Sequence, residues 1–370
     1  MAQELVLVGG GHAHVDVLKR FGLEPVPGVR LTLVTRDLET PYSGMLPGLV
    51  AGVYSRAESH IDLTRLVSSA GARLIHAETN GLDRVDRVVL CSGHAPVGYD
   101  FVSLDIGAGP DLSIPGAREV GVPVKPVDGF LERFDALLRD AQASGRAPRI
   151  AIVGGGAGGV ELSLAIERRL RDFAGGASVG LVTRHDILPD YPARGREVLR
   201  RELERRGIDL VTNAEVAEAR PGALVCRGGR SLAFNEAIWV TGATPPVWLA
   251  DTGLALDDGG FVALEPTLRS ANDPFVFAAG DVATVLEHPR PKAGVFAVRQ
   301  GKPLEQNLRR ALAGKPLRPF RPQAEFLTLI GTYDGAAVAS RNGLAASGAW
   351  AWRLKQWIDR RWIRQYQALT

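Results

Sequence analysis

The 370-residue chain is longer than a single hydrophobic core usually supports, which predicts two or three domains. Its composition, 45% hydrophobic and 23% charged, is ordinary for a globular protein, and no run of about 18 apolar residues could span a bilayer. The formal charge of +3 does not favour a polyanion-binding surface, and two cysteines are too few for a disulfide framework. Because no secretory signal is recognised either, we expect a cytoplasmic protein that binds no nucleic acid.

The chain opens with an apolar run that breaks into glycines. Residues 5–8 have the pattern of a buried parallel strand, residues 9–11 are all glycine, and a helical pattern follows. Glycine lets the backbone approach a pyrophosphate, and a helix N-terminus supplies free N–H donors. We therefore predict a dinucleotide-binding βαβ unit.

Two histidines are unusual in this first turn. His14 stands where the third glycine or alanine of the motif is expected. One hypothesis is that His12 or His14 contacts a phosphate or the bound cofactor. The other is that His14 fills space between helix and strand. No carboxylate or thiolate cluster accompanies the pair, so we predict no metal site.

The next strand is expected over residues 29–35. In a dinucleotide-binding unit this strand ends in an acid that binds the ribose, but here Thr35 and Arg36 stand at its end. Asp37 either takes that role or is a solvated loop acid. Residues 40–52, rich in Gly and Pro, are predicted to form an irregular loop at the ligand-binding edge of the sheet. Alternating runs over residues 73–99 predict antiparallel strands.

The opening pattern repeats about 145 residues later. In the second copy Gly154, Gly156 and Gly159 have all three spacings of the motif. Further matches along the two halves include Cys91 and Cys226, which fall at equivalent places. The sequence therefore predicts one domain type used twice, with both cysteines as structural residues.

The last third of the chain contributes a strand end and a terminal helix. The apolar run 273–283 ends at Gly280-Asp281, where a carboxylate can accept hydrogen bonds from sugar hydroxyls. A helix is expected to begin near Val295, with its N-terminus directed at the same crevice. The final helical pattern interleaves tryptophans with arginines, which suits an anionic membrane surface; packing on the protein or in a homodimer is the alternative.

These features resemble the two-dinucleotide flavoproteins of the pyridine nucleotide–disulfide oxidoreductase superfamily, which includes type II NADH dehydrogenases. The resemblance rests on the two glycine turns, Thr-Gly-Ala at 241–243 and Phe-Ala-Ala-Gly-Asp at 277–281. Four further motifs are most similar to the branch found fused ahead of selenide, water dikinase: residues 10–14, 42–48, 291–301 and 352–361.

The resemblance implies an α/β fold with two Rossmann-like, glutathione reductase-like domains and a small C-terminal α+β segment. An FAD-binding domain would comprise residues 1–112 and 262–318. An NAD(P)-binding domain would comprise residues 113–261, and the C-terminal segment residues 319–370.

The resemblance also implies the site residues. FAD would be bound by the first turn, the strand and loop after it, Asp281 and the start of the late helix: Gly9, Gly11, His12, Ala13, His14, Thr35, Arg36, Pro47, Asp281, Val295 and Phe296. The nicotinamide dinucleotide would be bound by Gly154, Gly156, Gly159, Arg184 and Gly242. Glu161 stands where family members place a glutamate near the nicotinamide, and it is the candidate catalytic residue.

The implied reaction passes hydride from NADH or NADPH to FAD and then electrons to a second acceptor, with a quinone as the first choice. Disulfide reductases are disfavoured, because no cysteine pair follows the first long loop. Val295 and Arg299 replace glutamines that type II dehydrogenases present to the quinone. The alternatives are a reductase of a ferredoxin or rubredoxin and a flavin redox sensor without turnover.

Two predictions concern the nucleotide and the location. Arg184 and His185 suit a 2′-phosphate and favour NADPH, although Thr35-Arg36 repeats the pattern in the FAD half. If the helix at 350–370 binds an anionic membrane, the protein is peripheral on the inner face of that membrane.

Overall fold

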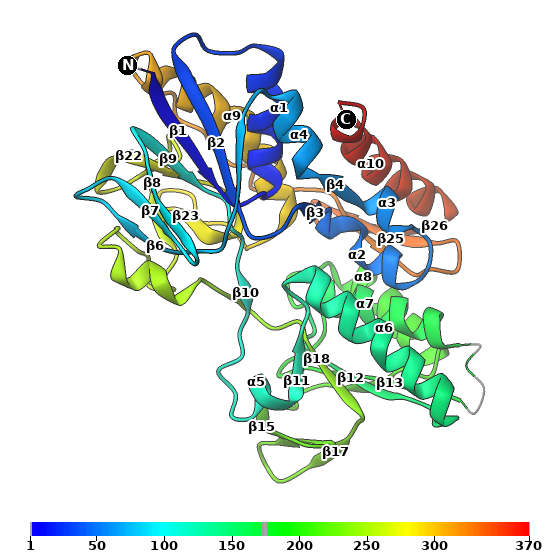
Figure 1. Cartoon of the computed structure of the whole chain (residues 1–370). Coiled ribbons are helices and arrows are strands. Elements are labelled where there is room, and N and C mark those ends of the chain that lie inside the picture. Colours follow the sequence, from blue (N-terminus) through cyan, green and yellow to red (C-terminus); the bar gives the residue numbers. More distant parts are fainter. Residues whose placement is uncertain (1, 172, 174–175, 370) are drawn as a thin grey trace.

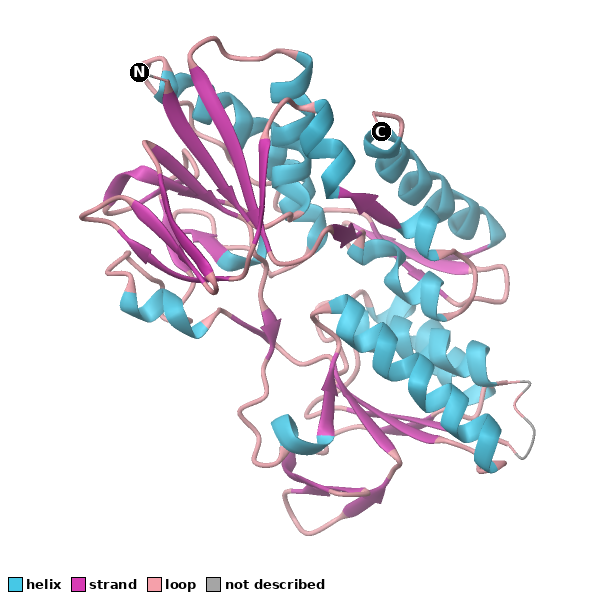
Figure 2. Cartoon of the chain, viewed as in Figure 1, coloured by secondary structure: helices cyan, strands magenta, loops and turns pink. Residues whose placement is uncertain are grey.

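The computed structural model describes residues 2–171, 173 and 176–369, which form two α/β units (Figure 1). In Figure 2 each unit is a layered arrangement of strands and covering helices. This is the predicted α/β fold with two Rossmann-like units.

The first unit is built on an eight-stranded sheet. Strand β1 (Gln3–Val8) pairs in parallel with β2 (Val29–Thr35) and β9 (Phe101–Leu104). Leu5, Val6 and Leu7, whose side chains alternate between the two faces, are all fully buried, as expected for a strand covered on both faces. The sheet continues through β5 (Arg73–His76) on one side, and on the other through β22 (Asp273–Ala278), β21 (Arg269–Ser270), β20 (Val262–Leu264) and β23 (Ala283–Val285).

Helices cover one face of this sheet. A small antiparallel sheet shares the hydrophobic core of the first unit. The helices are α1 (His12–Leu23), α4 (Leu63–Ser69) and α9 (Gly294–Leu312), which starts one residue before the expected Val295. The small sheet is formed by β6 (Thr79–Asp83), β7 (Val88–Cys91) and β8 (His94–Gly98). The prediction of antiparallel strands over 73–99 was wrong for β5, which pairs in parallel with β2.

The second unit repeats this plan around a five-stranded parallel sheet. Its strands lie in the order β11 (Gly121–Pro123), β18 (Glu236–Trp239), β12 (Arg149–Val153), β13 (Ser178–Val182) and β14 (Asp209–Val211). Its helices are α5 (Ala117–Val120), α6 (Val127–Ser144), α7 (Ala157–Leu170) and α8 (Ala193–Arg205). A second small sheet comprises β15 (Val216–Arg220), β16 (Ala223–Cys226) and β17 (Ser231–Ala233).

The two cysteines mark the repeat in three dimensions. Cys91 ends the middle strand of the first small sheet and Cys226 ends the middle strand of the second. Both thiols are free, and burial raises the pKa of each. They therefore occupy equivalent structural positions in two different units.

The chain passes between the units along two short strands, β10 (Gly109–Pro110) and β19 (Ala243–Thr244), which pair antiparallel. After β19, the 3-10 helix η2 (Val247–Asp251) leads back to the first unit, and Leu249 and Leu254 pack into its core. The domain boundaries set out above stay predictions.

The remaining elements lie beside the junction of the two units. Residues 40–52 were expected to be irregular, but they contain the end of β3 (Glu39–Pro41), η1 (Ser43–Met45) and α2 (Leu46–Val50). Pro47 is tolerated in α2 because the first N–H groups of a helix have no intrahelical partner. Next come α3 (Arg56–Ser59) and β4 (His60–Asp62), which pairs with β3; a further 3-10 turn, η3 (Gly280–Val282), follows β22.

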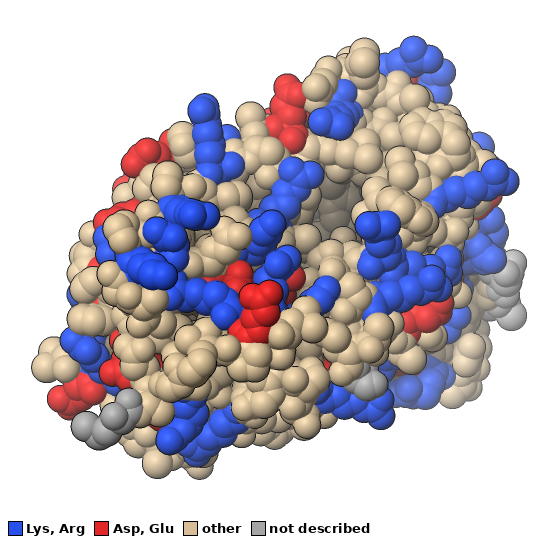
Figure 3. Space-filling view, turned by 90° about the horizontal axis from the view of Figure 1, so that it is seen from above, with Lys and Arg blue, Asp and Glu red and all other residues tan. Residues whose placement is uncertain are grey.

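The C-terminal part is a three-stranded antiparallel sheet followed by one long helix. The strands are β24 (Thr328–Gly331), β25 (Ala337–Arg341) and β26 (Leu344–Gly348), and the helix is α10 (Ala349–Gln367). Helix α10 lies along this small sheet and beside the first unit (Figure 1). Figure 3 views the molecule from above, where Lys and Arg side chains are spread over the surface and acidic side chains are fewer.

Candidate functional site

A cavity of about 770 Å³ opens where the carboxyl ends of β1, β2 and β9 meet. Its volume lies within the range of small-molecule sites, and this edge is where such sheets bind ligands. One wall comes from the first unit, and the other from residues 125–128 and 246–248, which enter and leave the second unit. The predicted residues that line it are Gly9, Gly11, His12, Thr35, Arg36 and Asp281.

The first glycine turn is shaped by Asp105, the residue after β9. Gly9 has φ +89°, and a Cβ there would lie 2.5 Å from the Asp105 carbonyl oxygen. A Cβ on Gly11 would overlap the Asp105 carboxyl group. No residue other than glycine fits this turn without moving Asp105. The backbone is therefore left bare toward the cavity.

Asp105 also binds the start of α1. Its Oδ2 accepts hydrogen bonds from the backbone N–H groups of Ala13, at 2.8 Å, and His14, at 3.0 Å. Burial raises the pKa of Asp105 to about 7, although the two N–H donors oppose the shift. Ala13 is fully buried and does not line the cavity, so its N–H serves the turn itself.

His14 lies behind the turn, between α1 and β9. Its Nδ1 lies 2.7 Å from the carbonyl oxygen of Gly9, and its Nε2 lies 2.8 Å from Oγ of Ser103. Burial lowers the pKa of His14 to about 4, so the ring is neutral. The carbonyl can only accept, so Nδ1 donates to it and Nε2 accepts from the Ser103 hydroxyl. The structure thus places His14 in the packing position, with both ring nitrogens engaged.

His12, in contrast, faces the cavity. Its Nε2 lies 3.2 Å from Oγ of Ser43, and burial and the nearby Lys125 lower its pKa to about 4. Its ring centroid is 5.5 Å from that of Tyr42 and 5.1 Å from that of Trp362. A neutral, uncharged ring therefore stands at the wall between the cavity and α10.

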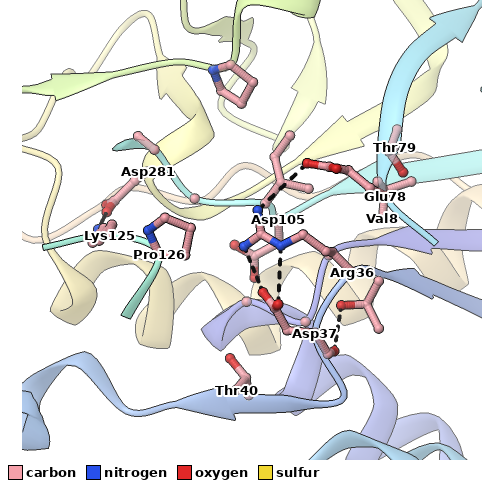
Figure 4. A pocket seen from close by; sticks show the side chains of 18 of the residues that line it. Val8, Arg36, Asp37, Thr40, Glu78, Thr79, Asp105, Lys125, Pro126 and Asp281 are labelled. Carbon is pink, nitrogen blue, oxygen red and sulfur yellow. Dashed lines mark hydrogen bonds and ion pairs between the residues drawn. The ribbon is translucent and has the colours of Figure 1, made fainter. Parts of the chain in front are cut away.

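Asp281 meets a lysine that comes from the other wall. Lys125 Nζ lies 2.8 Å from Asp281 Oδ2, and both residues line the cavity (Figure 4). Lys125 follows β11 of the second unit, whereas Asp281 belongs to the turn after β22 of the first. This ion pair joins the two units across the cavity.

The end of β2 supplies a second polar region of the wall. Arg36 forms an ion pair with Asp37, 2.8 Å between Nη2 and Oδ2, and its Nη1 is 3.8 Å from Oε1 of Glu78 (Figure 4). Thr35 donates its hydroxyl to the Asp37 carbonyl at 3.0 Å. Asp37 lines the cavity with its carboxylate paired to Arg36, and its ribose role stays a prediction.

Besides Ala13 and His14, three predicted FAD residues lie outside the cavity lining. Pro47 is buried inside α2, and Val295 and Phe296 are on the first turn of α9. The α9 residues that do line the cavity are Gly294 and Ala297, since positions three apart share a helix face. The expected helix start at Val295 was one residue too late; a start at Gly294 places Gly294 and Ala297 on the same face.

The second glycine turn is the tighter of the two. Gly154 has φ +129°, and a Cβ on Gly159 would overlap the Gly154 carbonyl oxygen, so α7 approaches β12 closely. Gly156 is exposed, as is Arg184 just after β13. Gly242 is also exposed, in the segment before β19, where its carbonyl accepts from the Asp111 N–H at 2.6 Å.

Glu161 lies in a buried cluster rather than in the cavity lining. Its Oε1 accepts from the Gly331 N–H at 2.9 Å and the Tyr333 hydroxyl at 2.8 Å, and lies 3.4 Å from Lys355 Nζ. Burial lowers the pKa of Lys355, but Glu161 and Asp359 outweigh it and raise that pKa above its ordinary value. The predicted catalytic role of Glu161 stays a prediction.

The sequence profile of the family described as "Pyridine nucleotide-disulphide oxidoreductase" matches residues 3–301, which include both glycine turns and Asp281. The chain belongs to the pyridine nucleotide-disulphide oxidoreductase family. Relatives named NADH dehydrogenases and oxidoreductases identify this family member as an enzyme.

Three relatives resemble this family member over most of its length. NADH dehydrogenase-like protein Rv1812c of Mycobacterium tuberculosis is 27% identical over 82% of this chain and 79% of its own. Probable ferredoxin reductase CtmF of Castellaniella defragrans is 27% identical over 87% and 78%. Demethylphylloquinone reductase NdbB of Synechocystis is 25% identical over 93% and 88%.

A solved structure shares the whole fold. The sulfide:quinone oxidoreductase of Aquifex aeolicus superposes with a TM-score of 0.83 at 15% identity, over 100% of this chain and 92% of that one. Within the described residues, none of the helices of this family member has the length and apolar character needed to cross a bilayer.

This oxidoreductase family uses a flavin together with NAD(P)H, and the cavity fits a flavin. Two glycines whose Cβ positions are blocked by Asp105 leave the backbone open to a pyrophosphate. Asp37 and Asp281 offer carboxylates to sugar hydroxyls, and Gly294 brings the N-terminus of α9 to the same space.

Three residues of the site in this oxidoreductase were missed in the sequence. Asp105 ends a parallel strand at the same edge as Asp281, so the rule that identified Asp281 would have found it too. Lys125 lies in the connection between units, where no periodic pattern marks it. Lys355 lies in the basic C-terminal helical pattern, but its side chain is buried, and two acids that face it compensate its charge.

Proposed function

We propose that this protein is an FAD-dependent NAD(P)H dehydrogenase that delivers electrons to a quinone. The observation that carries the proposal is one cavity walled by the first glycine turn, by Asp281 and by the entry to a second unit with its own intact glycine turn. Such a pairing suits two dinucleotides, one held at each turn.

The chain's residues would share the work as follows. Gly9 and Gly11 admit the FAD pyrophosphate, and Asp37 and Asp281 accept from sugar hydroxyls. Gly154, Gly156 and Gly159 hold the nicotinamide dinucleotide. When bound, the flavin accepts hydride from NAD(P)H and passes electrons onward. The protein therefore contributes alignment and exclusion of water rather than acid–base catalysis.

The start of α9 supplies the electrostatic part. Gly294 and Ala297 line the cavity at the positive end of a 19-residue helix. A helix N-terminus stabilises negative charge that develops beside it. Lys125, which is paired with Asp281, adds a second positive group at the same wall.

A quinone is the acceptor that the surroundings favour. Tyr42 and Trp362 stack with ring centroids 4.2 Å apart, and the pair adjoins His12 of the cavity wall. Aromatic side chains of this kind suit a flat apolar ring. The name of NdbB, a quinone reductase, supports the same acceptor class. Val295 and Arg299 in place of glutamines mean that any quinone site here has a different polar frame.

The outer face of α10 supports a peripheral membrane location. Trp350 and Trp357 are 52% and 57% exposed, and Leu344 at the start of β26 is 76% exposed. Exposed Arg353, Arg361 and Arg364 accompany them: apolar rings beside basic side chains suit an anionic interface. Trp362, in the same helix, packs inward on Tyr42. We propose the inner face of the membrane as the location, with a homodimer contact as the alternative use of the patch.

Anaerobic mixing with NAD(P)H, followed by an acceptor screen, tests the function. Flavin bleaching within about a second and fast reoxidation by a short-chain quinone are expected. Reoxidation by ferredoxin or rubredoxin instead would establish the alternative suggested by the name of CtmF. Slow flavin bleaching by NAD(P)H would favour a redox sensor without turnover.

The motif resemblance to the branch fused ahead of selenide, water dikinase supports a narrower placement. The four motifs that resemble this branch lie at or beside the cavity. They are the histidine turn, the segment 42–48, the start of α9 and α10. Co-purification of a selenide, water dikinase activity with the natural protein would test that placement.

A further inference from the structure

We infer that the second nucleotide site selects NADPH, with Arg184 and His185 binding the 2′-phosphate of the adenosine ribose. The inference rests on the proposed function and specifies the substrate of the same site. It follows from the position of these residues, from the way the nearest acid is engaged and from a comparison of the two units.

The position of Arg184 is fixed by the glycine turn. Thr183 directly follows β13, and its side chain packs so closely on Gly155 that a Cβ on Gly155 would overlap the threonine hydroxyl. The next residues follow directly beside the turn, where a dinucleotide-binding unit meets the ribose of adenosine. Both Arg184 and His185 are exposed there.

The loop after β13 is held along the turn. The N–H of Leu188 donates to the Gly155 carbonyl at 2.8 Å, and the N–H of Asn213 donates to the His185 carbonyl at 3.3 Å. These bonds anchor both ends of the segment 184–188. Its two basic side chains are therefore displayed from a fixed backbone rather than from a free loop.

The nearest acid, Asp186, is paired with arginines of α8. NAD-binding units place a carboxylate at this strand end to accept from the 2′-OH. Here Asp186 accepts from the Ile187 N–H at 2.7 Å and forms an ion pair with Arg200 of α8, while Arg196 Nε lies 3.9 Å away. The carboxylate is thus directed to α8.

The two units use the same Thr-Arg sequence with opposite charge balance. Arg36 of the first unit is neutralised by Asp37 and faces Glu78. Arg184 of the second unit forms no ion pair among the described residues. If the Thr-Arg pair were only a structural feature of the repeated strand end, both arginines would be expected to have the same surroundings. The difference means that the second unit keeps a free guanidinium where a phosphate can supply two oxygens to it.

Binding of adenine nucleotide fragments tests the inference without turnover. The flavin-loaded protein is titrated calorimetrically with 2′,5′-ADP and with 5′-ADP, which differ in the phosphate at the 2′ position. We expect 2′,5′-ADP to bind at least about tenfold more tightly, since charge-assisted bonds to phosphate are worth that much. Arg184→Ala should abolish the difference, whereas Arg220→Ala, an exposed arginine of β15, should preserve it.

The outcomes separate the inference from the proposed function. Equal binding of the two fragments, or a preference that survives Arg184→Ala in a variant with unchanged melting temperature, would overturn the NADPH selection. A clear 2′,5′-ADP preference in a protein that reduces no quinone would support the inference and remove the proposed acceptor. In turnover assays, Arg184→Ala should lower the ratio of kcat/KM for NADPH to kcat/KM for NADH at least about tenfold.

Discussion

Lys355 Nζ lies 3.4 Å from Glu161 Oε1, so α10 and the second unit meet in a buried ion pair. The same ammonium lies 3.4 Å from Asp359 Oδ2 and donates to the Gly44 carbonyl at 3.0 Å. One cation therefore connects the C-terminal helix, the second unit and the segment before α2. Two acids share this cation, and burial raises the pKa of Asp359 to about 6.

Replacing the cation should loosen this junction. In Lys355→Met two buried carboxylates lose their partner, which typically costs about 3–5 kcal/mol. We expect a clearly lower melting temperature and faster proteolysis near α10. Arg353→Met on the exposed face of the same helix is the control. Equal melting temperatures for the two variants would show that the pair contributes nothing net.

The Asp359 carboxyl should make stability depend on pH. Its pKa is raised in the folded protein to about 6, above about 3.9 in an unfolded chain, so the folded state holds the proton more tightly. This contribution is fully present below pH about 3.9 and is lost as pH rises to about 6. Asp359→Asn should therefore gain stability relative to the parent across that window. Melting curves at several pH values measure it, and a parallel pH dependence of both proteins would contradict it.

Short sequence motifs predicted the local features of the site, but they did not predict ion pairs between residues far apart in the chain. The first glycine turn, Asp281 and the start of α9 follow from short motifs, and the structure brings them to one cavity. The burial of Lys355 could not be predicted, because helical spacing shows which residues share a face but not what that face contacts. Its partner Glu161 comes from a distant part of the chain, and no local pattern reports such a contact.

The first glycine turn should not tolerate a methyl group. In Gly11→Ala the new Cβ would overlap the Asp105 carboxyl, which also holds the start of α1. We expect the purified variant to lose most of its flavin, measured as the ratio of flavin to protein absorbance. Gly98→Ala, where nothing lies within 4 Å of the added Cβ, is the matched control. Full flavin content in Gly11→Ala would show that the turn does not hold the cofactor.

His14 should act through packing and hydrogen bonds. His14→Ala leaves a void and two unpaired partners, the Gly9 carbonyl and the Ser103 hydroxyl, at a cost of about 2–4 kcal/mol. His14→Gln, which can donate and accept, should recover part of that stability and keep flavin binding. The rate of flavin reduction by NAD(P)H is then expected to match the parent. A reduction rate that falls in His14→Gln while its stability is restored would make His14 a direct partner of the cofactor.

The exposed tryptophans of α10 should carry the membrane affinity. Trp350→Ser with Trp357→Ser removes two rings that are more than half exposed, so the fold loses little packing. We expect an unchanged melting temperature and several-fold weaker sedimentation with anionic liposomes; added salt should weaken the parent as well, because arginines contribute. Val85→Ser, a 92% exposed position on the hairpin between β6 and β7, is the control. Unchanged liposome binding together with a loss of dimer in sedimentation velocity would reassign the patch to a subunit contact.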